Sequence, residues 1–329
     1  MYALNGKTPT KLETINFSDL NWKESDIEEL LRQNIDMLCD DEDSMLIIGQ
    51  QVQDINHKRS DLTAIDTDGN IVLIEIKRDV QDILSRKEPL EFQAIRYAAS
   101  CAAIKTSDEL IQNIFAPYVE KHRSEFGEDT LTSSELAKRI LADFMKQNNI
   151  TAFNSKQRII LISSGFDSQT LSAVAWLNSN HVDISCFQLC PFKYGNDILV
   201  DLKRILPLTE YGDYFVDIAD PSNPQKNGKK GGSKTTLPKI DDMLEWGVVQ
   251  AGDIIIPKGR SEEAVLLESG QIRTSQGEMS LQTWLKTIYG WQSVQTYAFA
   301  VLKRNGKTLS EMREDYMKRE AERAVIVDE

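Results

Sequence analysis

The segment 60–77 constrains the fold of this chain more than any other. Two runs rich in β-forming residues flank an Asp-Gly turn, a pattern that predicts a β-hairpin. Asp61 opens the first run, and Glu75 and Lys77 close the second. Residues directly opposite each other in an antiparallel pair share a face, and a slip of one residue reverses the faces. The length of the loop therefore decides whether these three side chains meet.

The two candidate loop lengths have opposite consequences. A two-residue loop would place Ile76 opposite Asp61, so that the two acids point to different faces. A three-residue loop, formed by a type I turn and a left-handed Gly69, places Glu75 opposite Asp61. Lys77 then lies on the same face, two residues further on. We predict the three-residue loop.

Two carboxylates and a lysine at one end of a hairpin suit the cleavage of phosphodiesters. A hydrolase must neutralise the charge of the scissile phosphate and lower the pKa of a bound water, and a hard cation does both. Asp61 and Glu75 offer oxygen ligands for Mg²⁺, whereas zinc would call for Cys or His. Lys77 would position the attacking water and stabilise developing charge. The alternative is that these are ordinary solvated residues at strand ends.

Helices expected on either side of the hairpin carry further polar side chains. Upstream, Ser25 is a candidate N-cap, with Glu28 three residues later. Glu28 or Glu29 would lie on or beside the apolar stripe of that helix, which consists of Ile27, Leu30, Leu31, Ile35 and Leu38. Downstream, the run 91–98 predicts a helix with Gln93 and Tyr97 on one face, four residues apart.

In this order the pieces resemble the PD-(D/E)xK nucleases, and among them the NucS-like branch. The motifs that carry the resemblance are Ile27-Glu28-Glu29-Leu30, Ile48-Gly49-Gln50-Gln51-Val52, Arg59-Ser60-Asp61-Leu62, Ile74-Glu75-Ile76-Lys77 and Gln93-Ala94-Ile95-Arg96-Tyr97. Ser60 stands where the family name has proline, a departure that is common in the superfamily.

The resemblance implies a role for each matched residue. Asp61 and Glu75 would be ligands of Mg²⁺ or Mn²⁺, and Lys77 the catalytic lysine. Glu28 would be the helix glutamate near the metal, although Glu29 also fits the motif. Gln93 would position a phosphate or the water. The implied fold is α/β, a restriction-endonuclease-like mixed sheet flanked by helices.

A strand, helix and strand follow in the stretch 158–188 and predict a βαβ unit, which fits a nuclease domain over 1–220. Inside this unit, the segment 163–168 differs by one residue from the S-G-G-x-D-S loop of ATP pyrophosphatases, because Ser164 replaces a glycine. An ATP-using enzyme is therefore an alternative, although we expect no organic cofactor.

The C-terminal part of the sequence predicts a second domain. A Lys- and Gly-rich linker is expected over 221–236, a small α+β domain over 237–305 and a solvated helix over 306–329. The small domain is expected to contain a hairpin over 263–275, a helix from Ser280 that Gly290 ends, and a closing strand over 296–303.

This domain resembles the RAMA domain, which is found with restriction and DNA-modification enzymes. The motifs that carry the resemblance are Leu244-x-x-Gly247-x-Val249-x-x-Gly252-Asp253-x-Ile255, Ala264-Val265-Leu266-Leu267-x-x-Gly270-x-Ile272 and Tyr289-Gly290-Trp291. The resemblance implies DNA recognition, including of modified bases. Aromatic residues that offer stacking surface, or else form the domain core, are Trp284, Tyr289, Trp291 and Tyr297.

The net charge of −13 at first argues against nucleic acid, because phosphate contacts need Lys and Arg. The distribution of charge matters more than the sum, and the stretch 221–239 contains five lysines and no acid. The expected DNA-contacting residues are Arg59, Arg78, Tyr97, Lys229, Lys230 and Trp291, with Arg86 and Lys87 as further phosphate contacts. The linker lysines would otherwise serve only solubility.

The N-terminus lacks the apolar core of a secretion signal, and no apolar run approaches the length of a membrane span. We therefore expect a cytoplasmic protein without membrane association. Its four cysteines are too few for a disulfide framework in 329 residues, and we expect them to be thiols.

Together the patterns predict a Mg²⁺-dependent DNA endonuclease with a DNA-reading C-terminal domain, in restriction or phage defence. Because two strands must be cut, we expect a homodimer. Three alternatives remain: a mismatch or branched-DNA repair nuclease, a catalytically silent DNA-binding protein, and the ATP-using enzyme.

Overall fold

The structure is a computed structural model that describes residues 1–39, 43–53, 59–126, 130–208 and 237–327. Two compact units divide the chain. The N-terminal unit comprises Met1–Met37 and Leu46–Leu208, and the C-terminal unit comprises Leu38–Met45 and Thr209–Glu329. The predicted linker over 221–236, with Lys229 and Lys230, lies outside the described residues.

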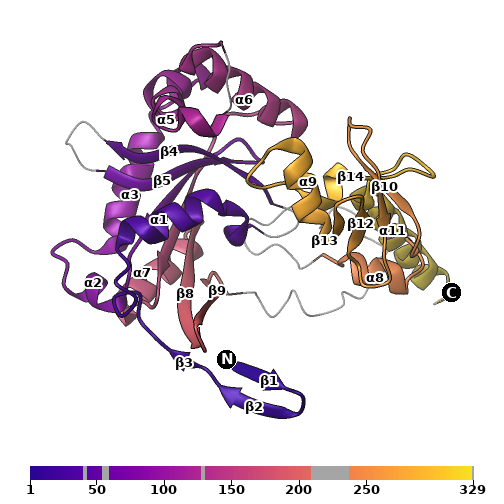
Figure 1. Cartoon of the computed structure of the whole chain (residues 1–329). Helices are drawn as coiled ribbons and strands as arrows, with labels where there is room; N and C mark the ends of the chain where they lie inside the picture. Colours follow the sequence, from indigo (N-terminus) through magenta and orange to yellow (C-terminus); the bar gives the residue numbers. More distant parts are fainter. Residues whose placement is uncertain (40–42, 54–58, 127–129, 209–236, 328–329) are drawn as a thin grey trace. The chain divides into compact units, whose positions relative to one another are not determined.

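A seven-stranded mixed sheet forms the centre of the N-terminal unit (Figure 1). Its order is β3, β8, β7, β6, β5, β4, and β9 also pairs with β8. β6, β7 and β8 are parallel, whereas β5 and β9 run antiparallel to their neighbours. The strands are β3 (Glu13–Thr14), β4 (Met45–Gln53), β5 (Arg59–Asp66), β6 (Ile71–Ile76), β7 (Gln157–Ser163), β8 (Ile184–Tyr194) and β9 (Asp197–Leu206). Strands β1 (Tyr2–Asn5) and β2 (Thr8–Lys11) form a separate hairpin.

The β5–β6 hairpin has the predicted three-residue loop. Leu62 lies opposite Ile74, a register that continues to Asp61 opposite Glu75. Gly69 has a φ of +80°, which is the left-handed conformation that the last loop position requires. β6 is buried along its whole length, as expected of a strand in the middle of a covered sheet.

The helices around the sheet follow the apolar stripes of the sequence. α1 (Glu24–Gln33) buries Ile27 and Leu31. The prediction that Ser25 caps this helix is wrong, because the N-cap is Lys23, two residues earlier. The Lys23 amide donates to the Asp26 carboxylate at 2.7 Å, so the carboxylate in the first turn takes the place of a serine cap.

α3 (Leu90–Cys101) contacts β6 and β7, and α7 (Ser168–Ser179) contacts α3 and β8. With the parallel pair β7 and β8, α7 confirms the predicted βαβ unit. Apolar residues of α3, α7, β7 and β8 share one buried cluster, so the helices are held to the sheet by side-chain packing. The other helices described in this unit are the short α2 (Val80–Leu84), α4 (Ser107–Leu110) and α5 (Ala116–Lys121), and the longer α6 (Ser133–Gln147). Shorter helical turns lie at Ile35–Leu38, Ile111–Phe115 and Arg123–Phe126.

The C-terminal unit is α+β, with an antiparallel five-stranded sheet in the order β13, β12, β11, β10, β14. Its strands are β10 (Ile254–Pro257), β11 (Ala264–Leu266), β12 (Ile272–Thr274), β13 (Gly277–Met279) and β14 (Ala300–Leu302). Its helices are α8 (Ile240–Glu245), α9 (Leu281–Tyr289), α10 (Thr296–Phe299) and α11 (Leu309–Val327).

The predictions for this unit are confirmed where they concern caps and turns. Ser280 caps α9, and Gly290 ends it with a φ of +68°. The predicted strand over 296–303 is wrong in its first half, which forms α10. α11 is also not wholly solvated, because Leu309 and Arg313 are buried, and Met312 and Tyr316 pack on the core.

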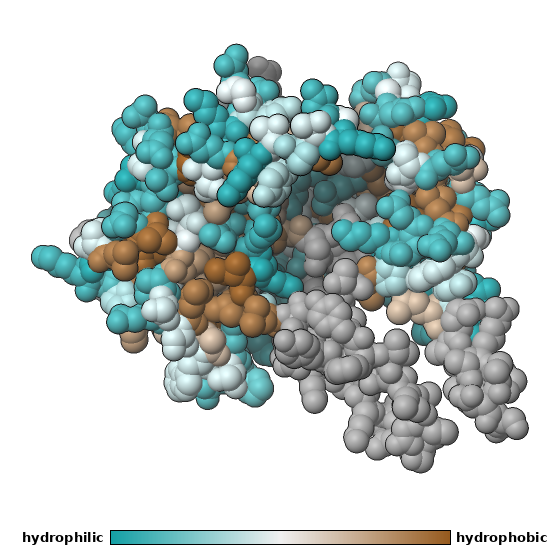
Figure 2. Space-filling model, turned by 90° about the horizontal axis from the view of Figure 1, so that it is seen from below, coloured by the Kyte–Doolittle hydropathy of each residue, from teal (hydrophilic) through white to brown (hydrophobic). Residues whose placement is uncertain are grey.

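Hydrophilic residues cover much of the surface seen in Figure 2, and apolar residues gather there in separate patches. Among the described helices, none is long and apolar enough to cross a membrane.

Candidate active site

The open end of the β5–β6 hairpin brings Asp61, Glu75 and Lys77 together. Asp61 Oδ2 accepts the Ile76 amide at 2.7 Å, which fixes this carboxylate against the neighbouring strand. Lys77 Nζ lies 3.9 Å from the same oxygen, and the lysine side chain is only 1% exposed. The Lys77 amide donates to Ile162 O of β7, so the lysine leaves the sheet from a defined position. The arrangement follows from the loop register.

Both carboxylates lie in surroundings that disfavour their charge. Burial raises the pKa of Asp61, and Lys77 and the Ile76 amide partly offset this effect. Burial and the charge of Asp61 raise the pKa of Glu75 well above its usual range. Glu75 is fully buried, and its Oε1 atom has no hydrogen-bond partner among the described residues. A buried acceptor without a partner is costly unless a ligand satisfies it.

The predicted helix face of α3 reaches the other oxygen of Glu75. Gln93 Nε2 donates to Glu75 Oε2 at 2.9 Å, and Arg86 donates to Gln93 Oε1 at 2.5 Å. Because Arg86 occupies the amide oxygen, the amide nitrogen of Gln93 must face Glu75. Burial and the charge of Glu75 raise the pKa of Tyr97, one turn along the same helix. Gln93 thus leaves one oxygen of Glu75 open.

Of the two candidate helix acids, Glu28 faces the site and Glu29 does not. Glu28 is 3% exposed; burial raises its pKa, the Gln51 hydrogen bond lowers it, and the charge of Asp61 raises it further. Glu29 instead pairs with Arg32 at 2.7 Å, an ion pair that lowers the pKa of Glu29. These surroundings favour Glu28 over Glu29 as the helix glutamate, and its role stays a prediction.

Two residues near the site were not predicted. Glu24 Oε2 lies 3.3 Å from Lys77 Nζ, and Gln51 Nε2 donates to Glu28 Oε2 at 2.5 Å. Glu24 precedes Glu28 by one helical turn, so the shared helix face was a usable signal. No pattern in the sequence pointed to the contact of Gln51.

The side chains that were predicted to contact DNA differ in their exposure and in their partners. Arg59 is exposed at the start of β5. Arg78 pairs with Asp82 at 3.1 Å, which leaves it one third exposed. Trp291 is partly buried and stacks on Tyr289 with ring centroids 4.8 Å apart.

Two of the four aromatic residues considered for stacking belong to the C-terminal core instead. Trp284 is 6% exposed and Tyr297 is 3% exposed, so neither offers a free ring face. The Tyr297 hydroxyl accepts the Ile240 amide at 2.7 Å. A domain of this size needs its large aromatic side chains to fill its core.

The helix start that suggested ATP binding is already capped. Asp167 Oδ1 accepts the amides of Gln169 at 2.8 Å and Thr170 at 3.0 Å. Ser164 Oγ donates to Asp79 at 3.2 Å. A phosphate would need the same amides at this helix start, and the Asp167 carboxylate would repel it.

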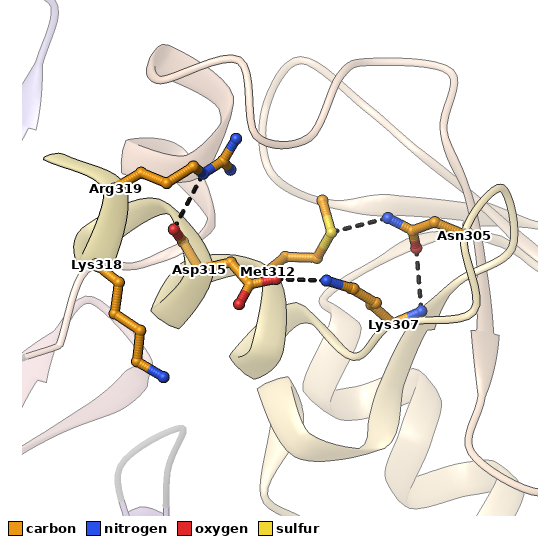
Figure 3. A pocket seen from close by; sticks show the side chains of 6 residues that line it. All are labelled: Asn305, Lys307, Met312, Asp315, Lys318 and Arg319. Carbon is orange, nitrogen blue, oxygen red and sulfur yellow. Dashed lines mark hydrogen bonds and ion pairs between the residues drawn. The ribbon is translucent and has the colours of Figure 1, made fainter. Parts of the chain in front are cut away.

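A pocket of about 440 Å³ lies on the C-terminal unit, at the start of α11 (Figure 3). Its lining comes from Asn305, Lys307, Met312, Asp315, Lys318 and Arg319. Lys307 donates to Asp315 Oδ2 at 2.5 Å, so one of its three cations is neutralised within the pocket. The pocket shares no residue with the carboxylate cluster.

Within the described ranges, no three His, Cys, Asp or Glu side chains are arranged to hold a metal ion as they stand. Mg²⁺ is commonly held by one or two carboxylates together with waters and substrate phosphate. Asp61 and Glu75 meet that smaller requirement. A bound cation would give Glu75 Oε1 a partner, which it lacks among the described residues. The cation would also offset the burial that disfavours the charges of both carboxylates.

Comparison of the chain with family models, curated proteins and solved structures found no match.

Proposed function

We propose that this chain is a divalent-metal-dependent DNA endonuclease. One observation carries the proposal: a hairpin places two largely buried carboxylates and a buried lysine together, and one carboxylate oxygen, Glu75 Oε1, has no partner in the part of the chain that the structure describes. If this hairpin served only stability, apolar residues in place of the buried carboxylates and lysine would often make the fold equally or more stable. On this proposal, the mixed sheet is a restriction-endonuclease-like fold of the PD-(D/E)xK type.

Each residue of the cluster has a role that its contacts support. Asp61 and Glu75 would hold Mg²⁺ or Mn²⁺, which supplies charge neutralisation and a water of lowered pKa. Lys77, held beside Asp61, would orient the attacking water and stabilise charge on the phosphoryl group. Gln93 fixes the rotamer of Glu75, and Glu28 would be the helix glutamate near the metal, where the charge of Asp61 helps to raise its pKa.

The C-terminal unit is proposed to read DNA as a RAMA-like domain. Trp291 is partly exposed next to Tyr289, and the Arg260 guanidinium lies 5.6 Å from the Tyr289 ring centroid. Lys258 Nζ lies 6.0 Å from the Phe299 centroid in the same aromatic cluster. Aromatic faces beside exposed cations suit bases and phosphates respectively. We propose a role in restriction or phage defence, as a cytoplasmic homodimer.

Cleavage assays on the full chain test the catalytic assignment. Modified, unmodified, mismatched and branched duplexes are incubated with Mg²⁺ or Mn²⁺ and either the native chain, Asp61→Asn or Lys77→Met. We expect each variant to lose roughly 10²–10⁴-fold in rate, as for removal of a group that acts in proton transfer or charge stabilisation. Asp68→Asn is the matched control, because it removes a carboxylate from the same hairpin outside the site.

The substrate series separates this proposal from its alternatives. Preferential cutting of mismatched or branched duplexes would favour a repair nuclease. DNA binding without cleavage under any metal would favour a silent DNA-binding protein. Native-like rates for both Asp61→Asn and Lys77→Met would refute the site itself.

A further inference from the structure

Gln51 has an unusual backbone conformation inside a strand. It lies within β4 and has a φ of +55°, the left-handed region that residues with a Cβ rarely adopt. The chain is closely packed there, since a Cβ on Gly49 would come within 2.5 Å of Val52 Cγ2 and 2.8 Å of Ile114 Cγ2. A non-glycine residue persists in such a conformation only when its surroundings require it.

The left-handed residue changes where two consecutive side chains point. In a regular strand, neighbours point to opposite faces. Here the Gln50 amide lies 3.5 Å from Glu29 Oε2, while Gln51 Nε2 donates to Glu28 Oε2 at 2.5 Å. Both glutamines therefore reach α1. A local irregularity that redirects a side chain is a recurrent device beside active sites.

The two glutamines differ in what they serve. The Gln50 amide oxygen accepts from Lys121 at 2.8 Å and contacts His122 Nε2 at 2.9 Å, so Gln50 joins α1 to α5. Gln51 is instead bonded to Glu28. Glu28 lies one turn after Glu24 on α1, and Glu24 Oε2 is 3.3 Å from Lys77 Nζ. The Gln51 side chain is half-buried and lies outside the fully buried core.

We propose that Gln51 is a positioning residue that holds the Glu28 carboxylate beside the metal site proposed at Asp61 and Glu75. The proposal rests on the proposed function, since it assigns Gln51 to the shell around the same metal site. The left-handed backbone of Gln51 directs its side-chain amide towards α1, whereas in a regular strand this side chain would point to the opposite face. Partners of this kind typically change metal affinity by 10- to 100-fold when they are removed.

Two substitutions separate the amide from the backbone. Gln51→Asn keeps an amide and tolerates the left-handed conformation well, but its amide ends one methylene short of Glu28. Gln51→Gly removes the side chain and relieves the backbone. Gln53→Asn makes the same change two residues further along β4 and serves as the matched control.

The full chain is titrated with Mn²⁺ by calorimetry, and the melting temperature is measured without metal. We expect both Gln51 variants to bind Mn²⁺ 10- to 100-fold more weakly than Gln53→Asn. Without metal, Gln51→Gly should melt near the native temperature, because relief of the strained backbone offsets the hydrogen bond lost from Glu28. Cleavage by Gln51→Asn should recover at high Mn²⁺, an effect that a purely structural role would not produce.

Asp61→Ala distinguishes failure of this inference from failure of the function. If Asp61→Ala abolishes Mn²⁺ binding while both Gln51 variants bind as tightly as the native chain, only the role of Gln51 is overturned. A lower metal-free melting temperature with unchanged affinity would likewise make Gln51 structural. If the native chain binds no Mn²⁺, both proposals fall.

Discussion

At the scale of single residues, Asp66 makes the stability of the hairpin depend on pH. It is 6% exposed, and its Oδ1 accepts the amides of Asp68 at 3.0 Å and Asn70 at 2.8 Å. Burial raises its pKa from 3.8 to about 6. Because the folded state holds this proton more tightly, the contribution of Asp66 to stability is complete below pH 3.8 and is lost as the pH rises to about 6.

Asp66→Asn should therefore stabilise the protein at neutral pH but not in acid. Asn keeps an oxygen acceptor for both amides and carries no charge. We expect a gain in unfolding free energy of roughly 1–3 kcal/mol at pH 7 that shrinks towards zero near pH 4. Urea unfolding at intervals between these pH values measures it. A difference that is constant with pH would show that the charge of Asp66 is not responsible.

The sequence predicted the residues of the site where their placement is local. Asp61, Glu75 and Lys77 are joined by a hairpin whose register follows from turn chemistry. Gln51 and Glu28 lie 23 residues apart, and their contact depends on how α1 packs beside β4. Contacts of that kind arise from tertiary structure and leave no periodic trace in a single sequence.

At the scale of elements, the hairpin depends on Gly69 for two separate reasons. Its φ of +80° disfavours any residue with a Cβ. A Cβ there would also lie 2.3 Å from Ala152 O and 2.6 Å from Ile150 Cγ2. The backbone of Gly69 is tied to this neighbouring segment as well, because its carbonyl accepts the Asn154 amide at 2.7 Å.

Gly69→Ala should therefore cost more than an ordinary left-handed substitution. We expect a loss of roughly 2–5 kcal/mol, the sum of conformational strain and overpacking. Gly195→Ala is the matched control, since Gly195 has a φ of +61° and an added Cβ would meet nothing within 4 Å, so that its substitution should cost about 1–2 kcal/mol. Chemical denaturation compares the two. Equal losses would contradict the close approach of the segment at Ala152.

Elements were predictable where a residue type leaves little choice. Gly69 and Gly290 marked a turn and a helix end because glycine adopts positive φ at little cost. The predictions for the start of α1 and for α10 were wrong because these boundaries depend on competing caps and on burial. Thr296, Tyr297 and Phe299 are buried in α10, and apolar β-forming residues suit a buried short helix as well as a strand.

At the scale of the whole molecule, the two units have separate hydrophobic cores. The cluster that contains Leu161 lies in the N-terminal unit, and the cluster that contains Leu302 lies in the C-terminal unit. Both leucines are fully buried. Units with their own cores commonly unfold in separate cooperative steps, so that a single melting temperature does not describe the chain.

We therefore predict two calorimetric transitions that respond to different substitutions. Leu302→Ala should lower the temperature of one transition and Leu161→Ala that of the other. Each substitution should reduce the unfolding free energy of its own unit by the roughly 2–5 kcal/mol that truncation of a buried leucine costs. Mn²⁺ should raise only the transition that Leu161→Ala lowers, because a ligand stabilises the unit that binds it. If either substitution shifted both transitions equally, the units would unfold as one, and the N-terminal sheet would depend on the C-terminal core.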